Sequence, residues 1–401
     1  MATALTDRDV DVLIVGAGAA GAACAETLRA SGFEGSVLLV GRDVDPPYER
    51  PFCSKEYLRG ELEREHTYLD LPEGLEVLVR TSVMKMDTAE RTAKLSNGEV
   101  VGFGKALLAT GANVRRLRLD GGQLEGIHYL RALGNSDAIR KQAAEVEKVV
   151  LIGGSYIACE VAASLASQGK QCTLVMQEEL PLSLGFGKAA GEFFAGVLRD
   201  HGVEWVGGDG LERFEGDEHV ERVITASGRS LDADMVVMGT GATPDVMLAR
   251  SAGLELGETG GILCSSSLET SVPGIWAAGD ACEYDSVVHG RRLRIEHWEL
   301  ARSQGAAVAA AMQGDSSPFS EVPYFWSDLA DWCTLEYVGP AHRWDREVVR
   351  GSIADGEFTI FYVDGDKVAA ALTVGRSDDL DDARRLMAGG EPVSDEALAA
   401  G

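Results

Sequence analysis

The chain opens with a short apolar run, a glycine-rich turn and a helical pattern. Residues 12–15 are all apolar, which predicts a strand that is buried on both faces. The residues from the glycines to Leu28 favour a helix, and a second apolar run at residues 37–40 predicts the next strand. Strand, turn, helix and strand in this order are typical of a parallel α/β sheet.

The same order of elements returns further along the chain. Residues 149–152 are apolar, a glycine turn and a helical segment follow, and residues 172–175 predict another strand. We therefore expect an α/β fold with two Rossmann-like dinucleotide-binding domains and a small α+β domain at the carboxyl end. Shorter strands are predicted at residues 75–79, 83–87, 93–95, 106–109, 236–238, 335–338, 348–353, 358–363 and 368–374, and helices at residues 193–201 and 380–387.

The first turn has the spacing of a dinucleotide fingerprint, G-x-G-x-x-G, at Gly16, Gly18 and Gly21. Gly16 permits the tight turn, Gly18 lets the backbone approach a pyrophosphate, and Gly21 lets helix and strand pack closely. Asp43 follows the second strand, where an acid can bind a ribose hydroxyl. The predicted contacts of this turn with a dinucleotide are Gly16, Gly18, Ala19, Ala20, Gly21 and Asp43.

The second turn keeps Gly153 but departs from the fingerprint afterwards. Ser155 stands in the second glycine position, and Met176 ends the next strand where an acid for a ribose diol is expected. Without basic residues near this strand end a 2′-phosphate has no partner, so we expect NADH and, less readily, NADPH. An impaired site, or one reshaped for another reductant, is the alternative. The predicted contacts are Gly153, Gly154, Ser155, Tyr156, Ile157, Glu178 and Gly241.

Charge and cysteine content exclude several classes of protein. The net charge of −27 over 401 residues disfavours nucleic acid and anionic membranes as partners. Seven cysteines without C-x-x-C spacing argue against structural disulfides and a metal site. Residues 1–10 lack the basic and apolar regions of a signal peptide, so we expect a cytoplasmic protein.

Residues 46–58, PPYERPFCSKEYL, resemble the PYxRPPLSKxxL signature of FAD-dependent reductases that pass electrons from NAD(P)H to ferredoxins and rubredoxins. These reductases are related to the pyridine nucleotide-disulfide oxidoreductases and to apoptosis-inducing factor. Phe52 and Cys53 depart from the signature. Further runs with this resemblance are ATG at 109–111, HYLRAL around Arg131, GGSYIACE at 153–160, AAGD at 277–280, RIEHW at 294–298 and PYFWSD at 323–328.

The resemblance implies a glutathione reductase-like architecture and roles for particular residues. It implies FAD-binding segments at 1–118 and 243–318, an NAD(H)-binding domain at 119–242 and a carboxyl-terminal reductase domain at 319–401. It assigns catalysis to Lys55 beside the flavin edge, to Glu160 as its partner, and to Trp326 near the flavin. The implied FAD contacts are Arg50, Lys55, Val83, Ala109, Thr110, Gly111, Arg131, Gly279, Asp280, Glu296, His297, Trp298 and Trp326.

The function implied by the resemblance is electron transfer from NADH through FAD to a small two-iron two-sulfur ferredoxin that serves an oxygenase, by a monomer or homodimer. Arginine clusters at 115–118 and 291–294 are candidate contacts for an acidic ferredoxin or scattered surface charge. Two alternatives stay open. Cys53 can be the nucleophile of a disulfide, persulfide or peroxide reductase, or a small hydrophobic residue. The chain can also be a flavin-loaded, redox-responsive binding protein.

Overall fold

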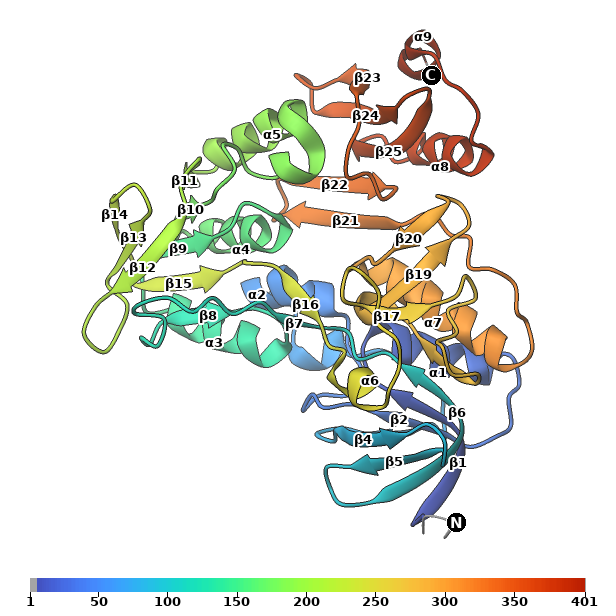
Figure 1. Ribbon diagram of the computed structural model, residues 1–401. Coiled ribbons are helices and arrows are strands. Elements are labelled where there is room, and N and C mark those ends of the chain that lie inside the picture. Colours follow the sequence, from blue (N-terminus) through green and yellow to red (C-terminus); the bar gives the residue numbers. More distant parts are fainter. Residues whose placement is uncertain (1–5, 401) are drawn as a thin grey trace. The chain divides into compact units, whose positions relative to one another are not determined.

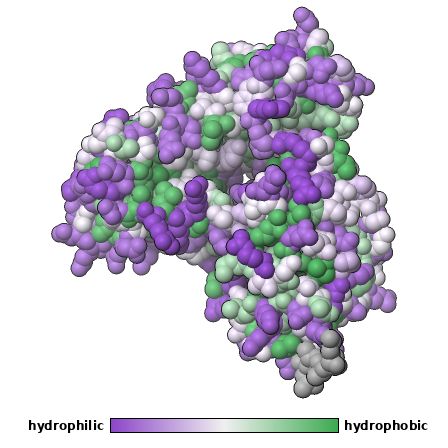
Figure 2. Space-filling model, in the orientation of Figure 1, coloured by the Kyte–Doolittle hydropathy of each residue, from purple (hydrophilic) through white to green (hydrophobic). Residues whose placement is uncertain are grey.

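The computed structural model describes residues 6–400, which form two compact units. The first unit contains residues 6–50, 68–113 and 243–325, and the second contains residues 51–67, 114–242 and 326–400. The first five residues, which belong to the segment considered above for a signal peptide, and Gly401 lie outside the described residues. No helix in the described part of the chain is both long and apolar enough to span a bilayer. Hydrophilic residues predominate on the face shown in Figure 2.

The first unit is built on a seven-stranded sheet in which β3, β2, β1, β6 and β18 run parallel. The antiparallel strands β5 and β4 extend this sheet from the amino-terminal half of β6. Helices α1 and α7 pack closely on each other, because Gly305 brings α7 against the backbone of Ala20. The elements, labelled in Figure 1, are β1 (Arg8–Val15), α1 (Ala19–Ala30), β2 (Val37–Val40), β3 (Glu76–Leu78), β4 (Val83–Asp87), β5 (Thr92–Leu95), β6 (Val100–Leu108), β18 (Ile275–Ala277) and α7 (Trp298–Met312).

The central strands of this sheet are apolar because both of their faces are covered. Leu13, Leu38 and Leu107 have no exposed surface, and they share one core with residues of α1 and α7. A smaller sheet and a short helix complete the unit. They are α6 (Met247–Ser251), β17 (Ile262–Cys264), the 3-10 turn η3 (Gly279–Ala281), β19 (Cys282–Ser286) and β20 (Arg291–Leu293).

The second unit begins with a parallel sheet of order β11-β10-β9-β15-β8. An antiparallel sheet, β12-β13-β14, is appended to it in sequence between β11 and β15. The elements are α2 (Glu56–Arg59), β8 (Ile127–Tyr129), α3 (Leu133–Ala143), β9 (Lys148–Ile152), α4 (Tyr156–Ala166), β10 (Gln171–Val175), α5 (Ser183–Asp200), β11 (Glu204–Val206), β12 (Leu211–Glu215), β13 (Arg222–Thr225), β14 (Ser230–Asp232) and β15 (Met235–Met238).

The same unit ends in a five-stranded sheet of order β21-β22-β25-β24-β23, whose pairs β22–β25, β25–β24 and β24–β23 are antiparallel. Its inner strands are strongly apolar, as the run from Phe358 to Val363 shows, since every residue there is buried. Helix α8 packs against β25. The elements are β21 (Tyr324–Leu329), β22 (Cys333–Val338), β23 (Arg346–Ser352), β24 (Glu357–Asp364), β25 (Lys367–Val374), α8 (Asp379–Gly389) and α9 (Asp395–Ala399).

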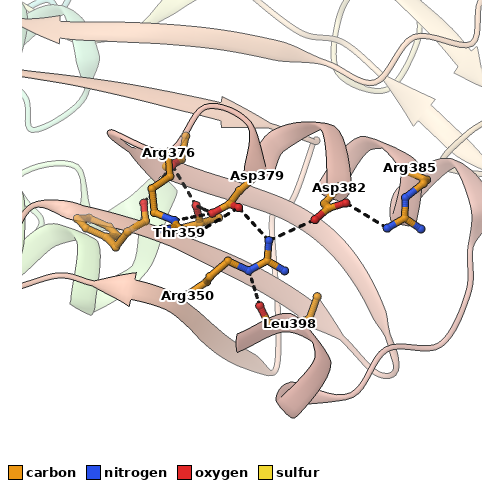
Figure 3. Close-up of polar contacts among 9 residues, drawn as sticks. Arg350, Thr359, Arg376, Asp379, Asp382, Arg385 and Leu398 are labelled. Atoms are coloured by element: carbon orange, nitrogen blue, oxygen red, sulfur yellow. Dashed lines mark hydrogen bonds and ion pairs between the residues drawn. The ribbon is translucent and has the colours of Figure 1, made fainter. Parts of the chain in front are cut away.

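The buried guanidinium of Arg350 joins strand β23 to the last two helices (Figure 3). Its Nε donates to the backbone oxygen of Leu398 in α9 at 2.7 Å, and its Nη1 donates to Asp379 of α8 at 2.9 Å. Asp379 also accepts hydrogen bonds from Thr359 and Arg376, each at 2.7 Å. Burial acts to raise the pKa of Asp379, but these donors more than offset it, so the pKa lies below its ordinary value.

Replacing Arg350 with leucine should therefore destabilise the protein by about 1.5–3 kcal/mol at neutral pH, as loss of hydrogen bonds to a charged group does. A carboxyl with a lowered folded pKa contributes stability above its unfolded pKa and loses it as pH falls. The difference in free energy of unfolding between Arg350→Leu and wild type should thus become smaller as the pH is lowered. Urea unfolding at neutral and acidic pH measures this, with Arg343→Leu, at an exposed pair, as the control near zero. Equal stability of Arg350→Leu and wild type at neutral pH would contradict the role of this cluster.

The predicted α/β fold class is confirmed, with two nucleotide-type sheets and a small carboxyl-terminal domain. Some boundaries differ from the expected ones. In the sequence, the prolines at 46, 47 and 51 predict an extended path before helix-forming residues begin near Ser54. The structure instead has a 3-10 helix at Arg50–Ser54, because Pro51 is tolerated in a first turn. The strand expected at 106–109 is the end of the longer β6, which stops at Leu108. Helix α5 begins ten residues before the expected helix at 193–201 and ends at Asp200.

Candidate active site

The carboxyl ends of four strands of the first unit lie side by side. Val15 of β1 is in register with Val40 of β2 and with Leu108 of β6, and Ala277 of β18 is in register with Leu108. The turns that follow these strands therefore meet at one edge of the sheet. In parallel α/β sheets this edge is where ligands bind. The sequence-predicted residues in these turns are Gly16, Gly18, Ala19, Ala20, Gly21, Asp43, Ala109, Thr110, Gly111, Gly279 and Asp280.

The three glycines of the first turn have different surroundings. Gly16 has a φ of +113°, and a Cβ there would lie 2.0 Å from the backbone oxygen of Ala109. A Cβ on Gly21 would lie 1.9 Å from the backbone oxygen of Gly16. Gly18, by contrast, faces open space, with no protein atom within 4 Å of such a Cβ. Gly16 and Gly21 are therefore required by packing, and Gly18 leaves room for a ligand.

Helix α1 presents its amino-terminal N–H groups at this turn. Its N-cap residue, Gly18, has no side chain that could accept a hydrogen bond from them. Unsatisfied N–H groups and the helix dipole favour an anion such as a pyrophosphate. The turn therefore fits the phosphates of a dinucleotide.

Asp43, Tyr48 and Arg50 form a small polar group beyond β2. The Asp43 carboxylate accepts a hydrogen bond from the Tyr48 hydroxyl at 3.2 Å and pairs with Arg50 at 3.2 Å. The Arg50 guanidinium also lies over the Tyr48 ring, 4.9 Å from its centroid. These contacts hold an acid and a cation near the turn of β2, where a ribose and a phosphate are recognised in this type of sheet.

A second group of predicted residues surrounds Asp280. A Cβ on Gly279 would lie 3.4 Å from Cβ of Ala20, so the 3-10 turn η3 lies against the start of α1. His297 is the N-cap of α7, and its ring packs 4.3 Å from that of Phe325. Burial lowers the pKa of His297 to about 4, despite the opposing effect of Asp280, so the imidazole is neutral at pH 7.

The buried Nδ1 atom of His297 has no hydrogen-bond partner among the described residues. A buried polar atom without a partner costs free energy, and a ligand group can supply that partner. Trp298 begins α7 directly after it, and Glu296 just before it pairs with Arg294 at 2.6 Å. These residues therefore fit the edge of a polar ring system such as a flavin.

The second unit repeats this arrangement of strand ends. Ile152 of β9 is in register with Val175 of β10 and with Met238 of β15, and Met238 is in register with Tyr129 of β8. Gly153 has a φ of +118°, and a Cβ there would lie 2.3 Å from the backbone oxygen of Gly239. The predicted residues in the turns of this edge are Arg131, Gly153, Gly154, Ser155, Tyr156, Ile157, Glu178 and Gly241.

The departures from the fingerprint lie together at this turn. A Cβ on Gly154 would lie 2.5 Å from Sδ of Met176 and 3.4 Å from Oε2 of Glu178. The Met176 side chain thus packs against the turn, and the Glu178 carboxylate lies beside it. Ser155 is the exposed N-cap of α4, and its hydroxyl makes no capping hydrogen bond. The first-turn N–H groups of α4 therefore lack a side-chain cap, as those of α1 do, and fit a second pyrophosphate.

A buried ion-pair cluster lies on the second unit, centred on Lys55. The Lys55 ammonium is 2.9 Å from Oε1 of Glu160 and 3.0 Å from Oδ2 of Asp328. Glu160 also accepts hydrogen bonds from Ser327 at Oε1 and from Ser54 at Oε2, both at 2.5 Å. The Lys55 side chain is only 5% exposed, so water contributes little to its charge balance.

Burial by itself lowers the pKa of Lys55, and the carboxylates of Glu160 and Asp328 more than offset this effect. The pKa therefore lies above its ordinary value, and Lys55 carries its charge at pH 7. From the sequence, a cation at a helix start is disfavoured by the helix dipole, which predicts either a specific anionic or electron-rich partner for Lys55 or a solvated surface lysine. Lys55 is indeed the N-cap residue of α2 and has two carboxylate partners.

Sequence reasoning assigned no role to Ser327 and Asp328, although both stand in the quoted run PYFWSD beside Trp326. Strand β21 directs both side chains to the Lys55 cluster. Successive residues of a strand point to opposite faces, so the strand pattern does not predict that the neighbours Ser327 and Asp328 reach the same cluster. The contact with Lys55 is also long-range in sequence. The only available signal was their position next to Trp326.

The remaining predicted residues are spread over both units. Val83 begins β4 of the first unit, and Trp326 lies in β21 of the second. Cys53, the candidate nucleophile, lies in the 3-10 helix of the second unit and is 3% exposed. A thiol that attacks a disulfide or peroxide needs access, so this burial favours its interpretation as a small hydrophobic residue.

Comparisons with known proteins give the same picture over the whole chain. Residues 10–305 match the family described as pyridine nucleotide-disulphide oxidoreductase, and residues 324–401 match the one described as reductase C-terminal. Putidaredoxin reductase of Pseudomonas putida is 33% identical, with 97% of this chain and 94% of the relative covered. The ferredoxin reductase component of chlorobenzene dioxygenase from a Cupriavidus strain is 31% identical, with 94% and 92% covered.

The solved structures include a covalent complex of putidaredoxin reductase with putidaredoxin. A chain of this complex matches the present chain with a TM-score of 0.91 and 32% sequence identity, and the match covers 98% of this chain and 96% of that chain. At this identity and coverage the likeness extends beyond the fold to the family. It spans both nucleotide-type sheets and the carboxyl-terminal domain.

Proposed function

Because the chain belongs to the FAD-dependent ferredoxin reductases of the pyridine nucleotide-disulphide oxidoreductase family, we propose that it passes electrons from NADH through FAD to a small ferredoxin that serves an oxygenase. The chain is thus an oxidoreductase that binds FAD and a nicotinamide dinucleotide. The observation that carries the proposal is the pair of uncapped glycine turns at the ligand-binding edges of two parallel sheets. Two such turns provide sites for two dinucleotides, and a hydride transfer needs both reactants to be held by the protein.

FAD supplies the redox chemistry, because a flavin accepts two electrons together and releases them singly. The protein's part is to bind and to orient. On this proposal Gly18 and the α1 amino terminus bind the pyrophosphate, and Asp43 and Asp280 accept hydrogen bonds from sugar hydroxyls. Lys55 supplies a fixed positive charge, and Glu160 and Asp328 hold it in place. Trp326 is proposed as an aromatic contact on the path of electrons leaving the site.

We propose that NADH is preferred over NADPH. The Glu178 carboxylate lies against the second turn, where it can accept hydrogen bonds from a ribose diol. A 2′-phosphate at that place would be repelled by the same charge. Ser155 and Met176 depart from the fingerprint of this turn, so the test measures the affinity for each nucleotide as well as the preference.

The partner proposed is a small two-iron two-sulfur ferredoxin. A similar reductase has been solved in covalent complex with putidaredoxin, which supports a small protein as the partner. Because the net charge is −27, long-range electrostatic attraction of an acidic ferredoxin is weak. Binding then depends on basic side chains within the contact surface. Of the candidate arginines, Arg292 pairs with Asp285 at 3.0 Å and Arg116 lies over the Tyr129 ring. We further propose a cytoplasmic monomer or homodimer, FAD-binding segments at 1–118 and 243–318, an NAD(H)-binding domain at 119–242 and a reductase domain at 319–401.

Rapid mixing of the FAD-loaded protein with NADH or NADPH under anaerobic conditions tests this function. We expect NADH to bleach the flavin absorbance with a specificity at least about tenfold higher than that of NADPH, which corresponds to about 1.4 kcal/mol. A small ferredoxin added afterwards should be reduced and restore the flavin absorbance. Absence of bleaching at millimolar NADH would refute the donor half of the proposal, and failure with a panel of ferredoxins would refute the acceptor half.

A further inference from the structure

The Lys55 ammonium has two carboxylate partners at nearly equal distance, although one is enough to neutralise it. Glu160 of α4 lies 2.9 Å away and Asp328 of β21 lies 3.0 Å away. The second oxygen of Asp328 accepts a hydrogen bond from Thr334 of β22 at 2.7 Å. Asp328 is therefore held by its own hairpin and does not depend on Glu160 for its place.

The other titratable groups near this cluster do not change its charge. Cys159 adjoins Glu160 and Cys333 adjoins Asp328, and burial raises the pKa of both thiols, to about 12 for Cys333, so both are neutral at pH 7. The neighbouring cation, Arg59, pairs with Glu61 and Glu56 and also interacts with the charge of Asp331. One ammonium thus faces two buried or half-buried carboxylates, which gives the cluster one excess negative charge.

An excess buried charge is costly, so the second carboxylate calls for a physical reason. With Glu160 alone, Lys55 would lose its partner whenever Glu160 turned to another donor, and a buried lysine without a partner loses its proton. Within the described residues, the Glu160 carboxylate accepts hydrogen bonds from the side chains of Ser54, Ser327 and Lys55. A second carboxylate on β21, with Thr334 as its own donor, removes the dependence of Lys55 on Glu160 alone.

We propose that Asp328 is a positioning residue that keeps Lys55 charged and in place independently of Glu160. The catalytic role of Lys55 rests on the proposed function. The redundancy of the two carboxylates does not, and it can be measured without any turnover.

The test uses FAD-loaded protein and the acetylation of Lys55, followed by mass spectrometry, at two pH values one unit apart and below the ordinary lysine pKa. Only the unprotonated amine reacts, so the rate of a charged lysine rises about tenfold per pH unit, and that of an uncharged lysine is nearly constant. This ratio does not depend on how easily the reagent reaches the site. Exposed Lys188 serves as the internal standard.

We expect the tenfold rise in wild type, in Glu160→Gln and in Asp328→Asn, and a nearly constant rate in the double variant. The matched control combines Glu160→Gln with Asp331→Asn, an exposed acid three residues further on, and should keep the tenfold rise. A further double variant, Glu160→Gln with Asp328→Glu, keeps a carboxylate at position 328. Its acetylation rate at Lys55 should rise about tenfold per pH unit, as in wild type.

Two outcomes would overturn the inference. If Glu160→Gln alone gave a constant rate, Glu160 alone would hold the charge. If the double variant kept the tenfold rise, neither carboxylate would be needed. Failure of NADH to bleach the wild-type flavin would instead end the proposed function and leave the labelling result intact.

Discussion

Replacing Lys55 with methionine is expected to slow flavin reduction by NADH at least about a hundredfold, the usual cost of removing a preorganised charge from a reacting site. The same change leaves Glu160 and Asp328 as buried carboxylates without their cation. Breaking a buried pair in this way costs about 3–5 kcal/mol of stability. Anaerobic rapid mixing measures the rate, and denaturant unfolding measures the stability.

A triple variant separates the two effects. Adding Glu160→Gln and Asp328→Asn to Lys55→Met removes the unpaired charges, so stability should recover while the slow flavin reduction persists. A folded Lys55→Met variant that reduced its flavin at the wild-type rate would remove Lys55 from the catalytic proposal.

Stability should also depend on Lys55 at alkaline pH. Its folded pKa is raised, so its contribution is fully present below the ordinary lysine pKa and is lost as pH rises through the folded value. The stability difference between Lys55→Met and wild type should therefore narrow above that range. This pH dependence of stability is opposite to that expected for Asp379, whose lowered pKa means that its contribution to stability is lost as the pH falls.

The parts of the fold that follow local rules could be predicted from the sequence. The apolar runs at residues 12–15 and 149–152, each followed by glycines, identified both nucleotide-type sheets, because buried parallel strands need apolar side chains on both faces. The strand ends then bring the predicted turns together, since parallel strands place their carboxyl ends at one edge. The full length of β6 was missed, because Gly102, Gly104 and Lys105 interrupt its apolar pattern.

The Lys55 cluster shows where sequence reasoning ends. A lysine at a helix start predicted a partner but not its identity, and the resemblance supplied Glu160 alone. Asp328 lies far from Lys55 in sequence, and no local pattern connects a β-strand of the last domain to a 3-10 turn near residue 54. Such contacts depend on tertiary packing. In the sequence, Met176 is only a departure from the fingerprint, and its packing against Gly154 is again a tertiary contact.

The first glycine turn allows folding and cofactor binding to be separated by two substitutions. Gly16→Ala should destabilise the protein by about 2–6 kcal/mol, because the new Cβ would lie 2.0 Å from a backbone oxygen and the φ of +113° strains any residue with a side chain. Gly18→Ala should cost less than about 1 kcal/mol in FAD-free protein, since its Cβ meets nothing within 4 Å. Its methyl group would instead occupy the space proposed for the pyrophosphate.

We therefore expect Gly18→Ala to remain folded and to bind FAD about 10- to 100-fold more weakly, a loss of about 1.4–2.8 kcal/mol. Denaturant unfolding of FAD-free protein and titration with FAD measure the two quantities separately. Gly134→Ala, in helix α3 of the second unit, also adds a methyl group to open space and should leave FAD affinity unchanged. Full FAD affinity in Gly18→Ala would mean that the phosphates do not lie against this turn, because a methyl group and a pyrophosphate cannot share the space beside Gly18.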